Sequence, residues 1–200
     1  NRNSLNADML KELTAEIDSL IERDARVIIV TGAGDTFSAG LDIKRFNDAP
    51  SPQGPSSHEL LDLLGNTVEK IDSCPVPTIA MIQGHCIGGS FELASAFDMR
   101  IASSETLFGI PPARLGLVYP YPGIMRIARI VGEPFARELF FTGSLYDASV
   151  MQRHSFINIV TDRTELRKVT MDIASTISGN SPTALTGIKQ IFTGLYDDSK

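Results

Sequence analysis

Apolar side chains recur along this chain in two patterns, a helical spacing and short continuous runs. Residues 6–24 carry apolar side chains three and four positions apart, which predicts an amphipathic helix that Asn6 can cap. The same spacing predicts helices over 58–72, 122–142, 147–153, 164–178 and 182–195. Apolar runs predict strands at 27–30 and 78–82, both buried on both faces, and a further short strand is expected at 98–102. Strand–loop–helix units with a helical C-terminal end indicate the α/β class.

One stretch between these elements has the composition of a loop. Residues 49–57 (APSPQGPSS) are rich in Pro, Ser and Gly, which predicts a surface loop. A linker between domains is the competing interpretation, but the flanking elements look too short to stand alone. A further helix is expected to begin near Asp42.

Composition bounds the class of protein. A chain of 200 residues corresponds to about one domain, and its 42% hydrophobic and 21% charged content is typical of soluble proteins. No apolar run approaches the ~18 residues of a membrane span. The net charge of −6 and the lack of a Lys/Arg cluster argue against nucleic acid as a partner. The scattered Cys and His residues lack metal-ligand spacing. With no visible secretion signal, a cytoplasmic location is expected.

Two glycine-containing segments carry the candidate chemistry. Residues 37–42 (FSAGLD) and 84–92 (GHCIGGSFE) each follow a predicted strand and open toward a predicted helix. The first N–H groups of a helix have no partner within it, so two such ends facing each other would form an oxyanion hole. Gly40, Gly88 and Gly89 permit backbone angles and close approach that a Cβ would block. Tight turns alone are the simpler interpretation of each segment.

These segments do not match better-known glycine loops. GAGDTF lacks the third glycine of a dinucleotide fingerprint, and no Gly-Lys-Ser/Thr follows a glycine run. Glu92 stands where a nucleophile elbow needs its last glycine, which argues against a serine hydrolase. With a helix beginning near Gly89, Glu92 lies in its first turn. There it serves either as an acid–base group or only as a carboxylate that stabilises the helix dipole.

At these residues the chain resembles the crotonase (enoyl-CoA hydratase/isomerase) superfamily. The resemblance covers nearly the whole chain, and the ordered combination of motifs is more specific than any one of them. The matching motifs are NSLN at 3–6, IIVTG at 28–32, FSAGLDI at 37–43, PVPTIAMIQG at 75–84, GGSFELA at 88–94, DMRIA at 98–102 and LGL at 115–117. Ser181, Pro182 and Lys189 fit a later helix of the family.

The resemblance implies a fold and an assembly. A crotonase-like spiral of repeated ββα units is expected over 1–160, followed by a C-terminal helical and oligomerisation region over 161–200. The family's N-terminal strand pair and its last helices are expected to lie outside these 200 residues. Homotrimers or dimers of trimers are the implied assembly.

The resemblance also implies a substrate, a coenzyme A thioester, with no separate cofactor. Its thioester oxygen is expected to accept hydrogen bonds from the backbone N–H groups of Leu41 and Gly89, which would stabilise an enolate. Further residues are expected to line the substrate path, namely Ala39, Gly40, Asp42, Ile43, Gly88 and Pro112.

The chain departs from the hydratases of this family at one of their two glutamates. The first matches Glu92, whereas the second position holds Pro112, which cannot act as an acid or base. The loss of one positioned acid–base group costs ~10²–10⁴ in rate. Methylmalonyl-CoA decarboxylases of the superfamily resemble this chain in that proline and in a tyrosine that matches Tyr119. They carry a histidine where this chain has Leu41.

Three interpretations remain open. The first is an enoyl-CoA hydratase/isomerase-type lyase that works through Glu92, with thioester hydrolysis as a variant. The second is the decarboxylation of a short malonyl-type thioester, in which Tyr119 orients the leaving carboxylate. The third is a non-catalytic crotonase fold that binds acyl-CoA or only packs in an oligomer.

Overall fold

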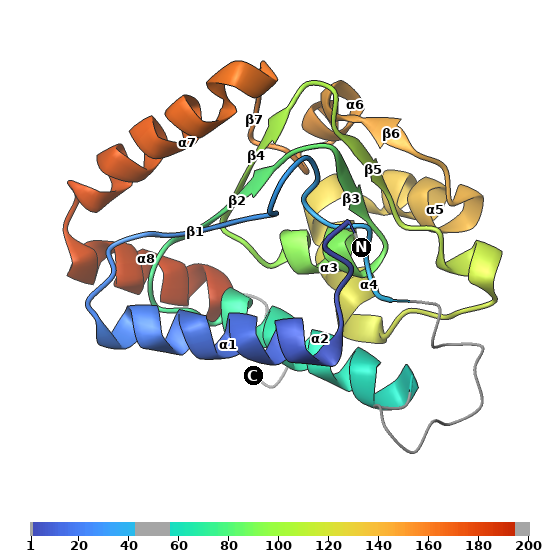
Figure 1. Cartoon of the computed structure of the whole chain (residues 1–200), viewed down its shortest axis with the longest axis horizontal. Helices are drawn as coiled ribbons and strands as arrows, with labels where there is room; N and C mark the ends of the chain where they lie inside the picture. Colours follow the sequence, from blue (N-terminus) through green and yellow to red (C-terminus); the bar gives the residue numbers. More distant parts are fainter. Residues whose placement is uncertain (1, 43–56, 195–200) are drawn as a thin grey trace.

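The computed structural model describes residues 2–42 and 57–194 of the chain. Its strands form two sheets (Figure 1). The first is parallel, in the order β1 (Ile28–Thr31), β2 (Thr78–Ile82), β4 (Met99–Ser103) and β7 (Ile159–Thr161). The second has the order β3 (His85–Ile87), β5 (Leu107–Gly109) and β6 (Tyr146–Asp147). Because β2 and β4 are each followed by a strand of the other sheet, the chain winds as a spiral.

Helices surround the two sheets. They are α1 (Ala7–Glu22), α2 (Ser57–Asp72), α3 (Gly89–Ser95), α4 (Tyr121–Val131), α5 (Glu133–Thr142), α6 (Ala148–Arg153), α7 (Arg163–Ser178) and α8 (Pro182–Gly194), with a 3₁₀ turn, η2, at Pro112–Leu115. Figure 1 shows α1 and α2 running together, with α7 beside the four-stranded sheet on another side. No helix within the described ranges is long and apolar enough to cross a membrane.

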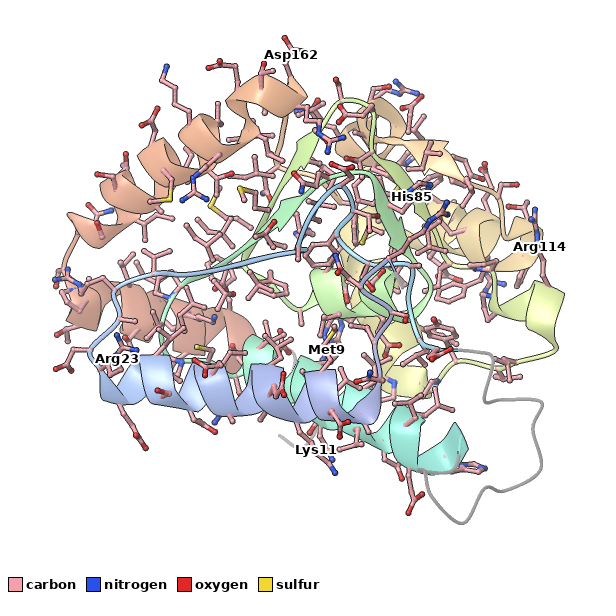
Figure 2. The ribbon with its side chains drawn as sticks, viewed as in Figure 1. Met9, Lys11, Arg23, His85, Arg114 and Asp162 are labelled. Atoms are coloured by element: carbon pink, nitrogen blue, oxygen red, sulfur yellow. The ribbon has the colours of Figure 1, made fainter. Side chains whose placement is uncertain are left out.

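The first helix forms as its sequence predicts. Asn6 caps α1, because its side-chain oxygen accepts a hydrogen bond of 2.8 Å from the N–H of Met9. Leu10 and Ile17 of its apolar stripe are fully buried. Figure 2 shows Met9 on the inner side of α1 and Lys11 on its outer side. Burial of this stripe against α2 sets the position of both helices.

The central helix α3 is buried along its whole length. Phe91 on α3 stacks on Phe156 with ring centroids 4.1 Å apart. The buried guanidinium of Arg100 on β4 donates to the carbonyl oxygens of Phe97, at 2.6 Å, and of Phe156. Burial lowers the pKa of Arg100 to about 10, so the group stays charged at neutral pH. These contacts hold the end of α3 against β4.

Several expectations need correction. The strand predicted at 27–30 is buried only at Ile28, because β1 lies at the edge of its sheet. The helical pattern over 122–142 corresponds to two helices, α4 and α5, which are divided at Gly132, whose φ is +80°. The second glycine segment contains the strand β3, so it does not pass directly from strand to helix. The short strands β5, β6 and β7 were not expected.

Other expectations are confirmed or stay predictions. β2 is buried at every position, as expected for a central strand. The α/β class and the spiral are confirmed by the two sheets and by the structural likeness reported below. The helix expected near Asp42 and residues 49–56 of the expected loop lie outside the described residues. The division into a core and a C-terminal region near residue 160 stays a prediction.

Candidate active site

The first glycine segment is held against the start of the chain. The N–H of Leu5 donates to the carbonyl oxygen of Gly40 at 2.8 Å, and the N–H of Asp42 donates to that of Leu5 at 3.1 Å. Leu41 stands between these two bonds, and its own N–H has no acceptor among the described residues. Gly40 has φ +90°, and a Cβ on it would overlap the carbonyl oxygen of Ile87. The segment therefore requires glycine at this position.

The second glycine segment meets the first through Ser90. The hydroxyl oxygen of Ser90 lies 2.9 Å from the carbonyl oxygen of Ser38 and accepts the N–H of Ile87 at 2.8 Å. Gly88, with φ +62°, makes the turn into α3. The helix begins at Gly89, as predicted from the sequence. Ser90 was missed by the sequence analysis, although its hydroxyl joins both segments.

Leu41 and Gly89 lie next to each other. A Cβ on Gly89 would come within 2.9 Å of Leu41 Cγ and within 3.2 Å of a methyl carbon of Leu64 on α2. Gly89 is the first residue of its helix, so its N–H has no partner within the helix. Among the described residues, no other acceptor takes that N–H. Within the described part of the chain, the N–H groups of the neighbouring residues Leu41 and Gly89 are thus both left without an acceptor.

Glu92 lies in the first turn of α3, three residues after Gly89, and is only 5% exposed. Its carboxylate accepts no hydrogen bond from the described residues, and it faces α4, where a Cβ on Gly123 would overlap Oε1. Every fully enclosed side-chain oxygen among the described residues has a hydrogen-bond partner. Because the Glu92 oxygens have none there, they are not fully enclosed. Burial raises the pKa of Glu92 to about 7, and the nearby positive charge of Arg126 opposes that rise.

Tyr119 is brought close to both Gly88 and Glu92. Its hydroxyl lies 3.9 Å from the place where a Cβ on Gly88 would stand. Its ring packs on Phe140 in an edge contact, with centroids 5.8 Å apart. Burial and the neighbouring Glu92 raise the pKa of Tyr119, so the phenol keeps its proton across the neutral range. The hydroxyl is a candidate hydrogen-bond donor.

The remaining predicted residues fall in different places. Gly40 is buried, Ala39 is exposed and donates its N–H to the carbonyl oxygen of Arg2, and Asp42 is half-buried. Pro112 is buried at the start of η2, directly after the segment that follows β5. Ile43 lies outside the described residues.

Two residues of α4 that the sequence analysis missed shape the surroundings of Glu92. Gly123 makes room for its carboxylate, and Arg126 supplies positive charge. An isolated glycine inside a helical pattern, as in YPGIMRIARIV, is a signal of close packing. Nothing local in the sequence indicates that the residue packed there is Glu92.

A separate cavity of about 760 Å³ lies along α4 and α8. Arg126, Asp72 and Lys189 line it, whereas Leu41, Gly89, Glu92 and Tyr119 do not. The cavity therefore adjoins the candidate site through Arg126 on α4 and through Ser95, whose hydroxyl donates to the carbonyl oxygen of Glu92 at 2.6 Å.

Comparison with known proteins identifies the family of this chain. A family model described as enoyl-CoA hydratase/isomerase matches residues 1–200. The short-chain-enoyl-CoA hydratase of Clostridium acetobutylicum is 36% identical over 192 residues, which cover 94% of this chain and 72% of that protein. A mitochondrial Delta(3,5)-Delta(2,4)-dienoyl-CoA isomerase of Dictyostelium discoideum is 31% identical over 198 residues, which cover 94% of this chain and 67% of that protein.

Solved structures show the same likeness. An enoyl-CoA hydratase/carnithine racemase from Magnetospirillum magneticum has a TM-score of 0.91 and 28% identity, over 100% of this chain and 75% of that chain. DspI of Pseudomonas aeruginosa has a TM-score of 0.90 and 29% identity, over 98% of this chain and 74% of that chain. The chain belongs to the enoyl-CoA hydratase/isomerase family. The expected trimeric assembly stays a prediction.

Proposed function

We infer that this chain is an acyl-CoA enzyme that stabilises a thioester enolate with the N–H groups of Leu41 and Gly89. The observation that carries the proposal is the first turn of α3. It offers the N–H of Gly89 and, three residues later, the buried carboxylate of Glu92, and neither has a hydrogen-bond partner among the described residues. Fixed N–H dipoles favour the negative charge that grows on the thioester oxygen, because they need no reorganisation during the reaction.

Glu92 is proposed as the acid–base group. A carboxyl group with a pKa of about 7 is present in both protonation states at neutral pH, which suits a group that accepts and returns one proton. In hydration, Glu92 would take a proton from water while the water oxygen bonds to the β-carbon. The electron pair of the C=C bond would move to the enolate, and Glu92 would then protonate the α-carbon.

Decarboxylation of a malonyl-type thioester is the second candidate. It is favoured by Pro112, which offers no second carboxylate, and by the protonated Tyr119 hydroxyl near Gly88. In this reaction the bond between the α-carbon and the carboxylate breaks, and CO₂ leaves. The electron pair passes to the thioester enolate, whose α-carbon then takes a proton from Glu92 or from water. No water needs activation, so one carboxyl group suffices.

The experiment is a product analysis by mass spectrometry after incubation with crotonyl-, 3-hydroxybutyryl-, malonyl- and methylmalonyl-CoA. Addition of water to crotonyl-CoA, abolished in Glu92→Gln, supports hydration through one glutamate. Loss of CO₂ from a malonyl-type thioester, abolished in Tyr119→Phe, supports decarboxylation. Turnover of none of them, with thioester binding intact, contradicts both and favours a binding protein.

A further inference from the structure

One guanidinium on α4 stands between two carboxylates. Arg126 Nη2 lies 3.3 Å from Asp72 Oδ2, and its side chain is 17% exposed. Gly123, three residues earlier, touches the carboxylate of Glu92. Residues three apart on a helix share a face, with Cβ atoms about 5–6 Å apart, so Arg126 starts within side-chain reach of Glu92. It nevertheless bonds only to Asp72 among the described carboxylates.

The place of Asp72 is not explained by its own helix. It is the last residue of α2, where a carboxylate meets the negative end of the helix dipole. Asp72 forms its ion pair with Arg126, on another helix, and both residues line the open cavity along α4. Asp72 therefore holds Arg126 toward the cavity.

Among the residues that the structure describes, few other charged or titratable groups face Glu92. From α4 the positive charge that acts on it is that of Arg126, and from the segment before α4 comes the Tyr119 hydroxyl. On α2 Asp72 is bonded to Arg126, and on β3 the Cys86 thiol donates to the carbonyl oxygen of Ser90. The protonation of Glu92 thus depends on its burial and on the distance of one guanidinium.

We propose that Asp72 is a positioning residue that anchors Arg126 away from Glu92, so that Glu92 remains able to exchange a proton with the substrate. This inference rests on the proposed function for the role of Glu92 in turnover. Its physical content concerns only the titration of one carboxyl group. It can therefore be measured without any substrate.

The test is the titration of Glu92, followed by ¹³C NMR in protein labelled at the Glu carboxyl carbon and assigned by comparison with Glu92→Gln. Asp72→Asn keeps the shape and removes the anchoring charge, so the Glu92 midpoint falls by about one pH unit as Arg126 turns to it. Arg126→Met raises the midpoint. Asp18→Asn on α1 breaks the ion pair that Asp18 makes with Lys70, which lies on α2 beside Asp72, and leaves the Glu92 midpoint unchanged.

The double variant, which combines Asp72→Asn with Arg126→Met, decides how Asp72 acts. If it acts by anchoring Arg126, Asp72→Asn shifts the Glu92 midpoint much less in the Arg126→Met background than in the wild type. An equal shift in both backgrounds overturns the proposal, because Asp72 then acts directly on Glu92. Unchanged midpoints in both single variants also overturn it. If circular dichroism shows that Arg126→Met is unfolded, Arg126→Gln is used in its place.

The titration separates this inference from the proposed function. If no thioester is turned over but the midpoints shift as stated, the proposed function fails and the role of Asp72 stands. If a thioester is turned over, the pH profile of kcat/KM in Asp72→Asn shifts in the same direction as the Glu92 midpoint. A profile that stays in place while the midpoint moves excludes Asp72 from a role in turnover.

Discussion

Gly123 of α4 lies directly against the carboxylate of Glu92 on α3. A Cβ at position 123 would overlap Glu92 Oε1 and come within 3.0 Å of the carboxyl carbon. Because residue 123 has no side chain, the Glu92 carboxylate can occupy this place against α4. The direction of the Glu92 carboxylate is therefore set by a residue of another helix.

Gly123→Ala is expected to displace the Glu92 carboxylate and to lower kcat/KM by about 10²-fold, the cost of a misplacement near 1 Å. The measurement is steady-state kinetics on whichever thioester the wild type turns over. Gly65→Ala on α2 is the control, because a Cβ there meets nothing within 4 Å. It should stabilise the chain by about 0.5–1 kcal/mol and leave kcat/KM unchanged. Unchanged kinetics in Gly123→Ala would contradict the packing argument.

Gly40→Ala is expected to destabilise the fold and to separate the two glycine segments. A Cβ there would overlap the carbonyl oxygen of Ile87 and lie 3.3 Å from the Gly89 nitrogen, and backbone atoms cannot turn aside. Gly34→Ala is the matched control, since Gly34 also has positive φ but open space around it. The control should cost about 1–2 kcal/mol in urea denaturation, from backbone conformation alone. Gly40→Ala should cost clearly more, and equal costs would show that the close approach is unimportant.

Glu92→Gln is expected to raise the free energy of unfolding at pH 8 and to change it little at pH 4. Burial raises the pKa of Glu92 from 4.5 to about 7 in the folded chain. The folded state then binds more protons than the unfolded state between these values, so wild-type stability falls as pH rises through that window. Removing the charge recovers roughly 3 kcal/mol at most. Urea denaturation at both pH values checks this, and an equal change at both would contradict it.

Lys189→Met is expected to loosen α8 from the core. Lys189 Nζ lies 2.6 Å from Asp98 Oδ2 and donates to the carbonyl oxygen of Val76. Asp98 also accepts from Thr78, so losing Lys189 leaves its charge only partly compensated. The expected cost is about 2 kcal/mol, below that of a fully buried pair because Asp98 is partly exposed. Hydrogen exchange should be faster in α8 and unchanged in α1.

Local patterns in the sequence determined a large part of this protein. The apolar spacing and the Asn6 cap predicted α1, the continuous apolar run predicted the buried strand β2, and the glycine segment placed Glu92 in the first turn of α3. These features depend on neighbours within a few positions of the chain. The ordered motifs were also sufficient to indicate the family.

Only the tertiary structure decided the rest. That β1 is an edge strand, and that β3 pairs with β5, depends on partners distant in the chain. Glu92 contacts Gly123 and lies near the charge of Arg126, and both of these residues belong to α4. Asp72, which pairs with Arg126, belongs to a third helix, α2. Burial and Coulomb interactions depend on distances through space, so the raised pKa of Glu92 has no counterpart in its neighbouring residues.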